Sequence, residues 1–307
     1  MKAGGDRIIV AALIFWLVSL PIGPDVPAQE TDRQNRPQSD SREDGLSRLS
    51  AESATVHRPN LSFERAAARN LELQSQMIWS FGGKSQRGWY LYAPLISTMI
   101  GAGDGPADGT FAMKLSIWQG INGLPASGVL DQATWLRMVA NLQSARISNR
   151  SYPDLGDLIT APVSDFYDLS RPEQLRKVER RTYAAYKRML RAAANDSALG
   201  LLKADSGQVA DDEPYLKIIS AFRSREYQEQ LRKRSPGSGR AGLAINSPHF
   251  TGRALDLYVG GAPVNTSDAN RAIQVNTRAY RWLLKNASRF GFKPYFYEPW
   301  HWEYVAD

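Results

Sequence analysis

The sequence predicts an α+β fold, in which a small antiparallel sheet with flanking helices follows a small helical domain. Short apolar or alternating runs typical of strands occur at 217–222, 254–259 and 299–305. Longer segments with the apolar period of a helix occur at 170–194, before the first run, and at 272–290, between the last two. Helices mixed with short strands in this way are typical of an α+β domain.

Composition allows two domains and excludes several kinds of site. The chain has 307 residues, enough for about two domains of ~100–200 residues. It contains no cysteine, which excludes disulfides, thiolate zinc sites and a cysteine nucleophile. The formal charge of +7 suits anionic partners. Because Lys and Arg are scattered rather than clustered, we predict no binding of nucleic acid.

The N-terminus has the three parts of a secretory signal peptide, predicted at 1–28. Lys2 and Arg7 precede an apolar run at 8–20, which is shorter than the ~20 residues of a membrane span. Two prolines and the small-residue sequence VPA at 26–28 follow, as at a cleavage site. We expect secretion to the periplasm or cell wall, with no stable membrane span after cleavage. An uncleaved N-terminal anchor is the alternative.

A tether and a helical domain are predicted next. Residues 29–60 have few and isolated apolar side chains, which cannot offset the entropy lost on ordering, so we predict a disordered tether. From 61 to 142 the chain is helical and apolar. There, Phe111 and Leu115 lie at helical spacing, and Asp131 is placed to cap a second helix.

The two short helices carry a resemblance of moderate specificity. The pattern WQ…GL…G..D..TW..M at 118–138 resembles the peptidoglycan-binding type 1 domain. The resemblance covers roughly 50 to 60 residues and implies binding to the bacterial cell wall. A generic helical hairpin is the alternative.

The C-terminal half is expected to be a separate domain at 170–307, after a linker at 143–169. The linker contains Pro153, Gly156 and Pro162. Ser170 and Glu173 match the capping-box pattern, which predicts that a long amphipathic helix begins there and runs to about residue 194.

Two of the chain's three histidines lie beside carboxylates. His249 lies in SPHFTGRALD, where proline and glycine exclude a regular helix, and it leads into a strand that carries Asp256. His301 lies in EPWHWEY, three residues after Glu298. Two histidines and one aspartate with an open fourth position are the ligand pattern of catalytic zinc, and Glu298 remains as a general base. From the residues alone, ordinary buried histidines are an equal alternative.

Three motifs together resemble a known enzyme family. S-x-H-x-x-G-x-A-x-D spans 247–256, E-x-x-H-W spans 298–302, and SAFRSREYQ at 220–228 is similar to the family's S-x-Y-R-S…Q, with Phe222 where tyrosine is common. Over roughly 172–307 the chain resembles the VanY-like zinc D-alanyl-D-alanine carboxypeptidases of peptidase family M15.

The resemblance implies a role for each motif residue. It implies His249, Asp256 and His301 as zinc ligands, Glu298 as the catalytic base and Arg223 as a cation that faces the substrate. We expect Arg223 to serve the oxyanion or the substrate carboxylate, an ordinary structural ion pair being the alternative. Further substrate contacts are expected from Gln228 and Ser247.

The expected function is hydrolysis of the terminal D-Ala-D-Ala bond of peptidoglycan stem peptides by a monomeric zinc metallopeptidase. An endopeptidase that cuts cross-links and an L,D-carboxypeptidase are alternatives that need the same metal residues. A non-catalytic wall-binding protein is a third. If the helical domain only binds the wall, a chain that begins near Pro153 should still hydrolyse small peptides.

Overall fold

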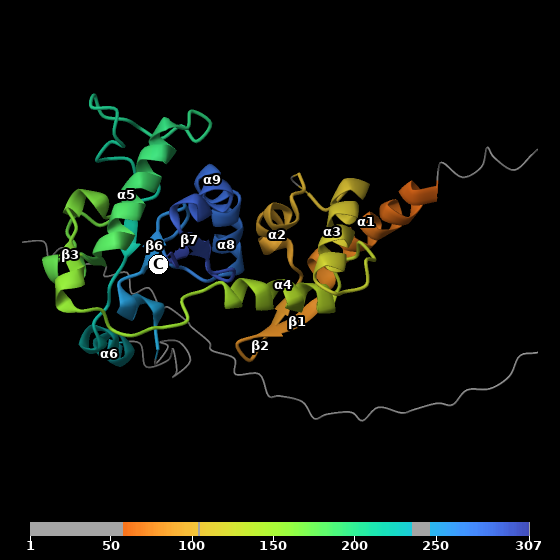
Figure 1. The fold of residues 1–307 in the computed structure, drawn as a ribbon, viewed down its shortest axis with the longest axis horizontal. Coiled ribbons are helices and arrows are strands. Elements are labelled where there is room, and N and C mark those ends of the chain that lie inside the picture. The colour runs from red at the N-terminus through yellow and green to blue at the C-terminus, as the bar shows by residue number, and fades with distance from the viewer. Residues whose placement is uncertain (1–57, 104, 235–245, 307) are drawn as a thin grey trace, which may run out of the picture.

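The computed structural model describes residues 58–103, 105–234 and 246–306. Figure 1 shows an N-terminal helical lobe beside a C-terminal lobe that contains the main sheet, and α4 extends from the helical lobe toward the C-terminal lobe. The predictions of a signal peptide at 1–28 and of most of the tether at 29–60 lie outside the described residues. In the described part of the chain, no helix combines the length and apolar character that crossing a membrane requires.

The described residues of the helical lobe form four α-helices and one hairpin: α1 (Arg58–Gln76), β1 (Ile78–Phe81), β2 (Lys84–Arg87), α2 (Ala93–Ile100), α3 (Gly109–Ile121) and α4 (Gln132–Ser144). The predicted cap at Asp131 is confirmed, because its side chain accepts a hydrogen bond from the Thr134 N–H. Asp108 caps α3 in the same way, through the Phe111 N–H. Both helices bury apolar residues, among them Leu115 on α3 and Trp135 on α4.

The C-terminal lobe confirms the α+β prediction. Its elements are β3 (Leu158–Thr160), β4 (Lys177–Glu179), α5 (Arg180–Asn195), β5 (Ile218–Ser220), α6 (Arg225–Arg234), β6 (Ala254–Leu257), α8 (Asp268–Val275), α9 (Arg278–Asn286), β7 (Phe292–Pro294) and β8 (His301–Tyr304). The main sheet has the order β5-β6-β8-β7, and all its pairs are antiparallel. β3 and β4 form a separate hairpin. β6 and β8 therefore lie at the centre of the sheet, and both are fully buried.

The helix predicted to begin at Ser170 and Glu173 is wrong at its N-terminal end. The Ser170 hydroxyl donates to Asp168 instead of capping a helix, and Lys177–Glu179 pair with β3 as strand β4. α5 begins only at Arg180, after Glu179, whose carboxylate accepts from two backbone N–H groups. Burial of a strand in the hairpin thus overrides the local capping pattern.

The single helix predicted at 272–290 is also wrong, because the chain divides it into α8 and α9. Thr277 lies between them, and its side chain caps α9 by accepting from the Tyr280 N–H. The predicted end at Gly291 is confirmed, where φ is 87°. β7 follows directly and was not predicted.

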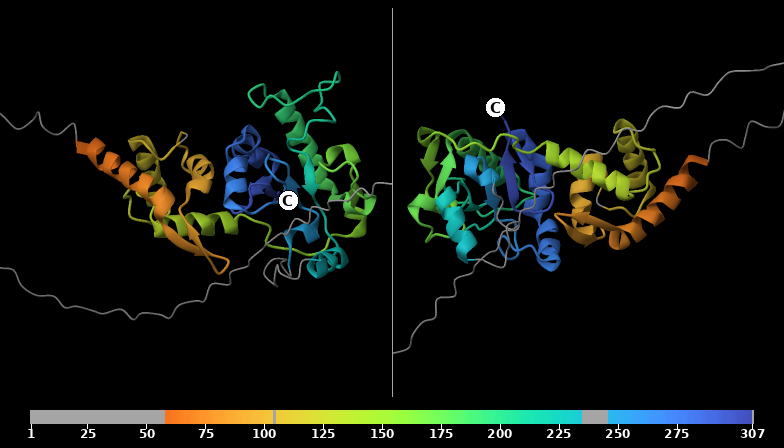
Figure 2. Two further views of the ribbon diagram at one scale, coloured as in Figure 1. Left: turned by 180° about the vertical axis from the view of Figure 1, so that it is seen from behind. Right: turned by 90° about the horizontal axis from the view of Figure 1, so that it is seen from below.

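The two lobes share an aromatic cluster. Trp79, Tyr92 and Trp135 of the helical lobe surround Phe296 of the C-terminal lobe, with Tyr92 and Phe296 ring centroids 5.6 Å apart. Arg271 on α8 donates to the Tyr92 hydroxyl at 3.0 Å. Figure 2 shows from two further sides that the lobes lie against each other. The helical lobe is thus packed onto the C-terminal lobe.

Candidate metal centre

The centre of the sheet places Asp256 and His301 side by side. They are directly paired in the antiparallel register of β6 and β8. Residues paired in this way point to the same face of a sheet. The alternation of each strand and one pairing register therefore bring together two side chains 45 residues apart in the sequence.

A short 3-10 turn, Pro248–Thr251, brings His249 to the same place. Ser247 caps this turn, and its hydroxyl accepts a hydrogen bond from the His249 N–H at 3.3 Å. Gly252 ends the turn at a φ of 69°, where a Cβ atom would lie 2.9 Å from the backbone nitrogen of Glu179. Only glycine fits this close approach, and the chain can then enter β6.

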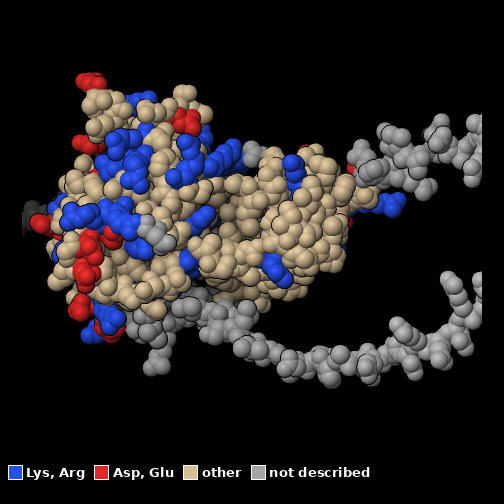
Figure 3. All heavy atoms as spheres, in the orientation of Figure 1, with Lys and Arg blue, Asp and Glu red and all other residues tan. Residues whose placement is uncertain are grey.

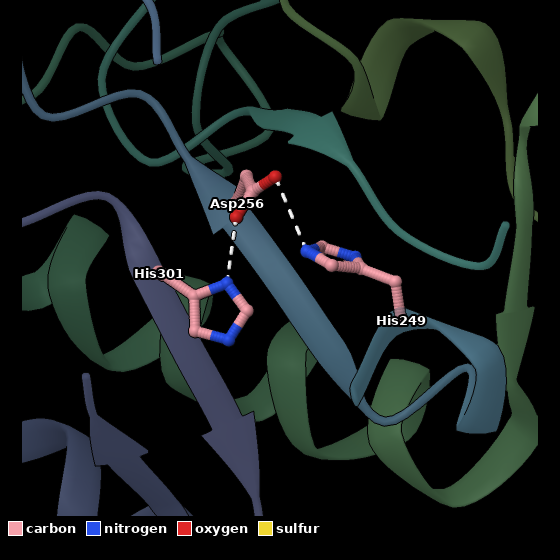
Figure 4. A group of neighbouring side chains, drawn as sticks. All are labelled: His249, Asp256 and His301. Atoms are coloured by element: carbon pink, nitrogen blue, oxygen red, sulfur yellow. Dashed lines mark hydrogen bonds and ion pairs between the residues drawn. The ribbon is translucent and has the colours of Figure 1, made fainter. Parts of the chain in front are cut away.

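Figure 4 shows the three side chains turned toward one another. The distance from His249 Nε2 to Asp256 Oδ2 is 3.3 Å, and from His301 Nδ1 to Asp256 Oδ1 it is 2.9 Å. All three side chains are completely buried. Within the described residues they form a group whose ligand atoms lie within 4.8 Å of one another.

The protonation of His249 shows that the group fits a cation. Its Nδ1 lies 2.7 Å from the Ala221 carbonyl, which can only accept, so the ring proton is on Nδ1. Burial, and then the charge of Arg223, lower the pKa of His249 to about 4, so Nε2 carries a lone pair at neutral pH. This lone pair faces a carboxylate oxygen at 3.3 Å. Two acceptors that face each other in a buried site need a cation between them.

The donor set suits zinc. It offers two imidazole nitrogens and one carboxylate oxygen, which is a known set for a catalytic zinc site with one open position. Burial alone raises the pKa of Asp256, but its interactions with His249 and His301 outweigh burial and hold it well below the usual range. Asp256 is therefore an anion, as a ligand must be.

Glu298 is a buried carboxyl group beside the donor set. It begins the turn into β8, and its carbonyl accepts the His301 N–H at 3.0 Å. Neither carboxyl oxygen has a hydrogen-bond partner among the described residues. Burial raises its pKa to about 8, with a further contribution from the charge of Asp256, although His301 opposes the shift. A carboxyl group in this state can accept a proton at neutral pH once a cation lies nearby.

Arg223 lies against the predicted ligands. Its Nη2 donates to Asp256 Oδ2 at 2.9 Å and its Nε to Ser220 Oγ at 3.0 Å. Its Nη1 is buried and has no partner within the described part of the chain. Nη1 is thus the guanidinium nitrogen left for a substrate, and a grip on a carboxylate through two nitrogens would have to share Nη2 with Asp256.

The other two predicted contact residues differ in what they offer. Ser247 is fully buried and its hydroxyl is used to cap the turn before β6. Gln228 on α6 is also buried, and both polar atoms of its amide are without a partner in the region that the structure describes. A bound substrate or water would satisfy that amide, so Gln228 keeps its predicted role more readily than Ser247.

Sequence reasoning missed two charged residues at this site. Glu303 is completely buried, and its Oε1 lies 3.1 Å from His301 Nε2. Arg146, from the segment predicted to be a linker, donates to the same Glu303 oxygen through Nε at 2.8 Å. The alternation in WHWEY places Glu303 on the face of His301, a signal that could have identified it. No local signal identifies Arg146.

The comparisons with known proteins concern the C-terminal lobe, which contains the three candidate ligands. Residues 175–307 match the family VanY: D-alanyl-D-alanine carboxypeptidase. The match begins after Arg146 and does not extend into the helical lobe, so it gives no support to the resemblance of 118–138 to a peptidoglycan-binding domain. No curated protein matches the chain.

Proposed function

We propose, from the VanY D-alanyl-D-alanine carboxypeptidase domain at 175–307, that this chain is a zinc D,D-carboxypeptidase. Its substrate is the D-Ala-D-Ala end of peptidoglycan stem peptides, met outside the cytoplasmic membrane after secretion. The observation that carries this proposal is Glu298, a buried carboxyl without a hydrogen-bond partner among the described residues, beside the three candidate ligands. A site that only bound a metal would not need this group.

His249, Asp256 and His301 would hold the zinc ion. When bound, zinc acts as a Lewis acid on the scissile carbonyl and lowers the pKa of water toward ~7. Asp256 is fixed by the guanidinium of Arg223, and His249 by the Ala221 carbonyl. These contacts hold both donor atoms toward the third ligand before any metal arrives.

Glu298 moves the proton in the reaction. Its carboxylate takes a proton from the attacking water and delivers it to the amine that leaves as D-alanine. The free Nη1 of Arg223 donates to the oxygen of the scissile carbonyl, where negative charge develops. Because burial raises the pKa of Glu298, its carboxylate is a stronger base than that of an exposed glutamate.

Hydrolysis of defined muropeptides tests the function. The zinc-loaded protein should shorten a pentapeptide ending in D-Ala-D-Ala by one alanine, as weighed by mass spectrometry. Shortening of the tetrapeptide instead would make it an L,D-carboxypeptidase, and cutting of cross-linked dimers an endopeptidase. A zinc-bound protein that cuts none of these substrates would be a wall-binding protein.

We also propose that the helical lobe binds peptidoglycan. α3 exposes Met113, Ile117 and Ile121 along one side, with Ile121 80% exposed. Figure 3 shows that charged side chains gather on the C-terminal lobe, whereas the face of the helical lobe seen there is largely uncharged. Replacement of Ile117 and Ile121 by serine should reduce sedimentation with wall sacculi and leave hydrolysis of soluble peptides unchanged. Unchanged sedimentation would contradict this role.

A further inference from the structure

We propose that Arg146 and Glu303 are positioning residues that orient His301 for metal binding, so that the segment after α4 completes the metal centre. This inference rests on the metal-binding part of the proposed function. It concerns residues that the donor set itself does not include. Arg146 also lies outside the family match at 175–307.

The two ring nitrogens of His301 face different partners. Nδ1 lies 2.9 Å from Asp256 Oδ1, on the side of the other candidate ligands. Nε2 lies 3.1 Å from Glu303 Oε1. If Nδ1 binds the metal, the ring proton must be on Nε2, where the carboxylate of Glu303 accepts it. That hydrogen bond selects the tautomer, fixes the ring plane and makes Nδ1 a better electron donor.

Glu303 can do this only as a fixed anion. Its side chain is completely buried, and a buried charge without partners is costly. Arg146 supplies Nε at 2.8 Å and a second bond from Nη2 to Oε1. The backbone N–H of Ile147 donates to Oε2 at 2.9 Å. Both oxygens are therefore held, and Oε1 is directed at the histidine.

Arg146 is in turn held by the end of the helical lobe. It lies just after α4, and its Nη1 donates to Gln143 Oε1 on the last turn of that helix at 3.1 Å. Its guanidinium carbon lies 4.0 Å from the ring centre of Tyr295, over the face of the ring. The Arg146 side chain is only 8% exposed. The path from α4 to the metal ligand thus consists of short, buried contacts.

The opposing interpretation is that Arg146 and Glu303 only fasten the two lobes together. In that case their loss would lower the stability of the protein but leave the affinity for metal unchanged. The positioning role predicts weaker metal binding in protein that remains folded. Metal affinity and ligand geometry therefore distinguish the two interpretations, whereas activity or thermal stability alone would not.

The experiment measures zinc affinity of the full chain by competition with a chelating indicator, with thermal unfolding of the metal-free protein alongside. Arg146→Met keeps an apolar side chain but removes the guanidinium group, and Arg146→Lys keeps the positive charge without the guanidinium geometry. Arg137→Met on α4 is the matched control, because Arg137 is exposed on that helix. We expect ~10–100-fold weaker zinc binding for Arg146→Met, the usual effect of losing an outer partner of a ligand. Arg146→Lys should lie between, and Arg137→Met should match the wild type.

Two further measurements decide the case. The visible absorption of the Co²⁺-substituted protein should change in Arg146→Met and not in the control, because the orientation of one ligand differs. If Arg146→Met does not fold, Arg146→Lys and Glu303→Gln, which keeps an acceptor but loses the charge, should still bind zinc more weakly than the wild type. Wild-type zinc affinity and an unchanged cobalt spectrum in the folded variants would overturn the inference and leave the proposed function intact. A wild-type protein that binds no zinc would overturn both.

Discussion

Replacement of Glu298 by glutamine separates catalysis from both metal binding and folding. The amide has the size of the carboxyl group but cannot accept the proton from water. Because Glu298 is not one of the three candidate ligands, zinc content should stay near that of the wild type. The rate constant kcat/KM on a D-Ala-D-Ala peptide should fall by ~10²–10⁴, the usual contribution of a positioned general base.

The same change should stabilise the metal-free protein. Burial raises the pKa of Glu298 from 4.5 to about 8, so between these values the folded protein keeps a proton that the unfolded chain has lost. The free energy of unfolding therefore falls as the pH rises through this window. At ~1.4 kcal/mol for each pH unit above the unfolded pKa, the penalty reaches ~3 kcal/mol at pH 7. Glutamine never ionises and escapes this penalty.

Urea unfolding in the presence of a chelator, monitored by tryptophan fluorescence at pH 5 and pH 7.5, measures the effect. The free energy of unfolding of Glu298→Gln should be clearly higher than that of the wild type at pH 7.5 and only slightly higher at pH 5. Glu213→Gln is the matched control: Glu213 is also buried, but its carboxylate accepts hydrogen bonds from the backbone N–H groups of Leu202 and Tyr215 at 2.7 and 2.9 Å. This control should be destabilised. An active Glu298→Gln enzyme, or one no more stable than wild type at pH 7.5, would refute the reasoning.

Four other predictions have defined outcomes. His301→Ala should lose zinc on metal analysis, and full occupancy would contradict the ligand assignment. Burial alone lowers the pKa of His301, but hydrogen bonds to two carboxylates outweigh burial and raise it to about 9. Zinc binding at pH 7 should therefore release at least one proton, and the affinity for zinc should increase as the pH rises toward 9. Binding heats that do not depend on the ionisation enthalpy of the buffer would contradict this. Arg223→Ala should reduce kcat/KM equally on a D-Ala-D-Ala peptide and its amide, because Nη1, the guanidinium nitrogen without a partner among the described residues, is expected to serve the oxyanion. A larger loss on the free acid would show carboxylate recognition. A chain that begins at Pro153 should bind zinc more weakly than the wild type, because it lacks the aromatic residues and the arginine that contact the C-terminal lobe. Wild-type affinity would contradict this and agree with the expectation from sequence that such a chain still hydrolyses small peptides.

The strands that carry the site could be predicted from the sequence, because the residue patterns that indicate them are local. The alternation in 254–259 and 299–305 predicts β6 and β8, and the glycine and proline around His249 predict a turn. The position of the start of α5 could not be predicted in the same way. Ser170 has the right spacing to cap a helix, but its hydroxyl bonds to Asp168, and the next residues gain more by pairing with β3.

The contact between Arg146 and Glu303 shows what sequence patterns omit. The two residues lie 157 positions apart, and nothing in the local periodicity of either one refers to the other. Proline and glycine in 143–169 predict a connector, but the structure places strand β3 (Leu158–Thr160) within this range. A connector can still contribute to a site, because a loop can place one side chain next to residues that a sheet holds.

The direct pairing of Asp256 with His301 makes metal uptake a measure of when the sheet forms. A shift of β8 by one residue would turn His301 to the opposite face and bring Trp302 beside Asp256. An incompletely or incorrectly paired sheet therefore offers at most isolated ligands, whose affinity for metal is weak. During refolding, the appearance of cobalt absorption would mark the moment at which the two central strands reach their final register. Cobalt absorption thus reports when the pairing of β6 with β8 is complete, without any added label.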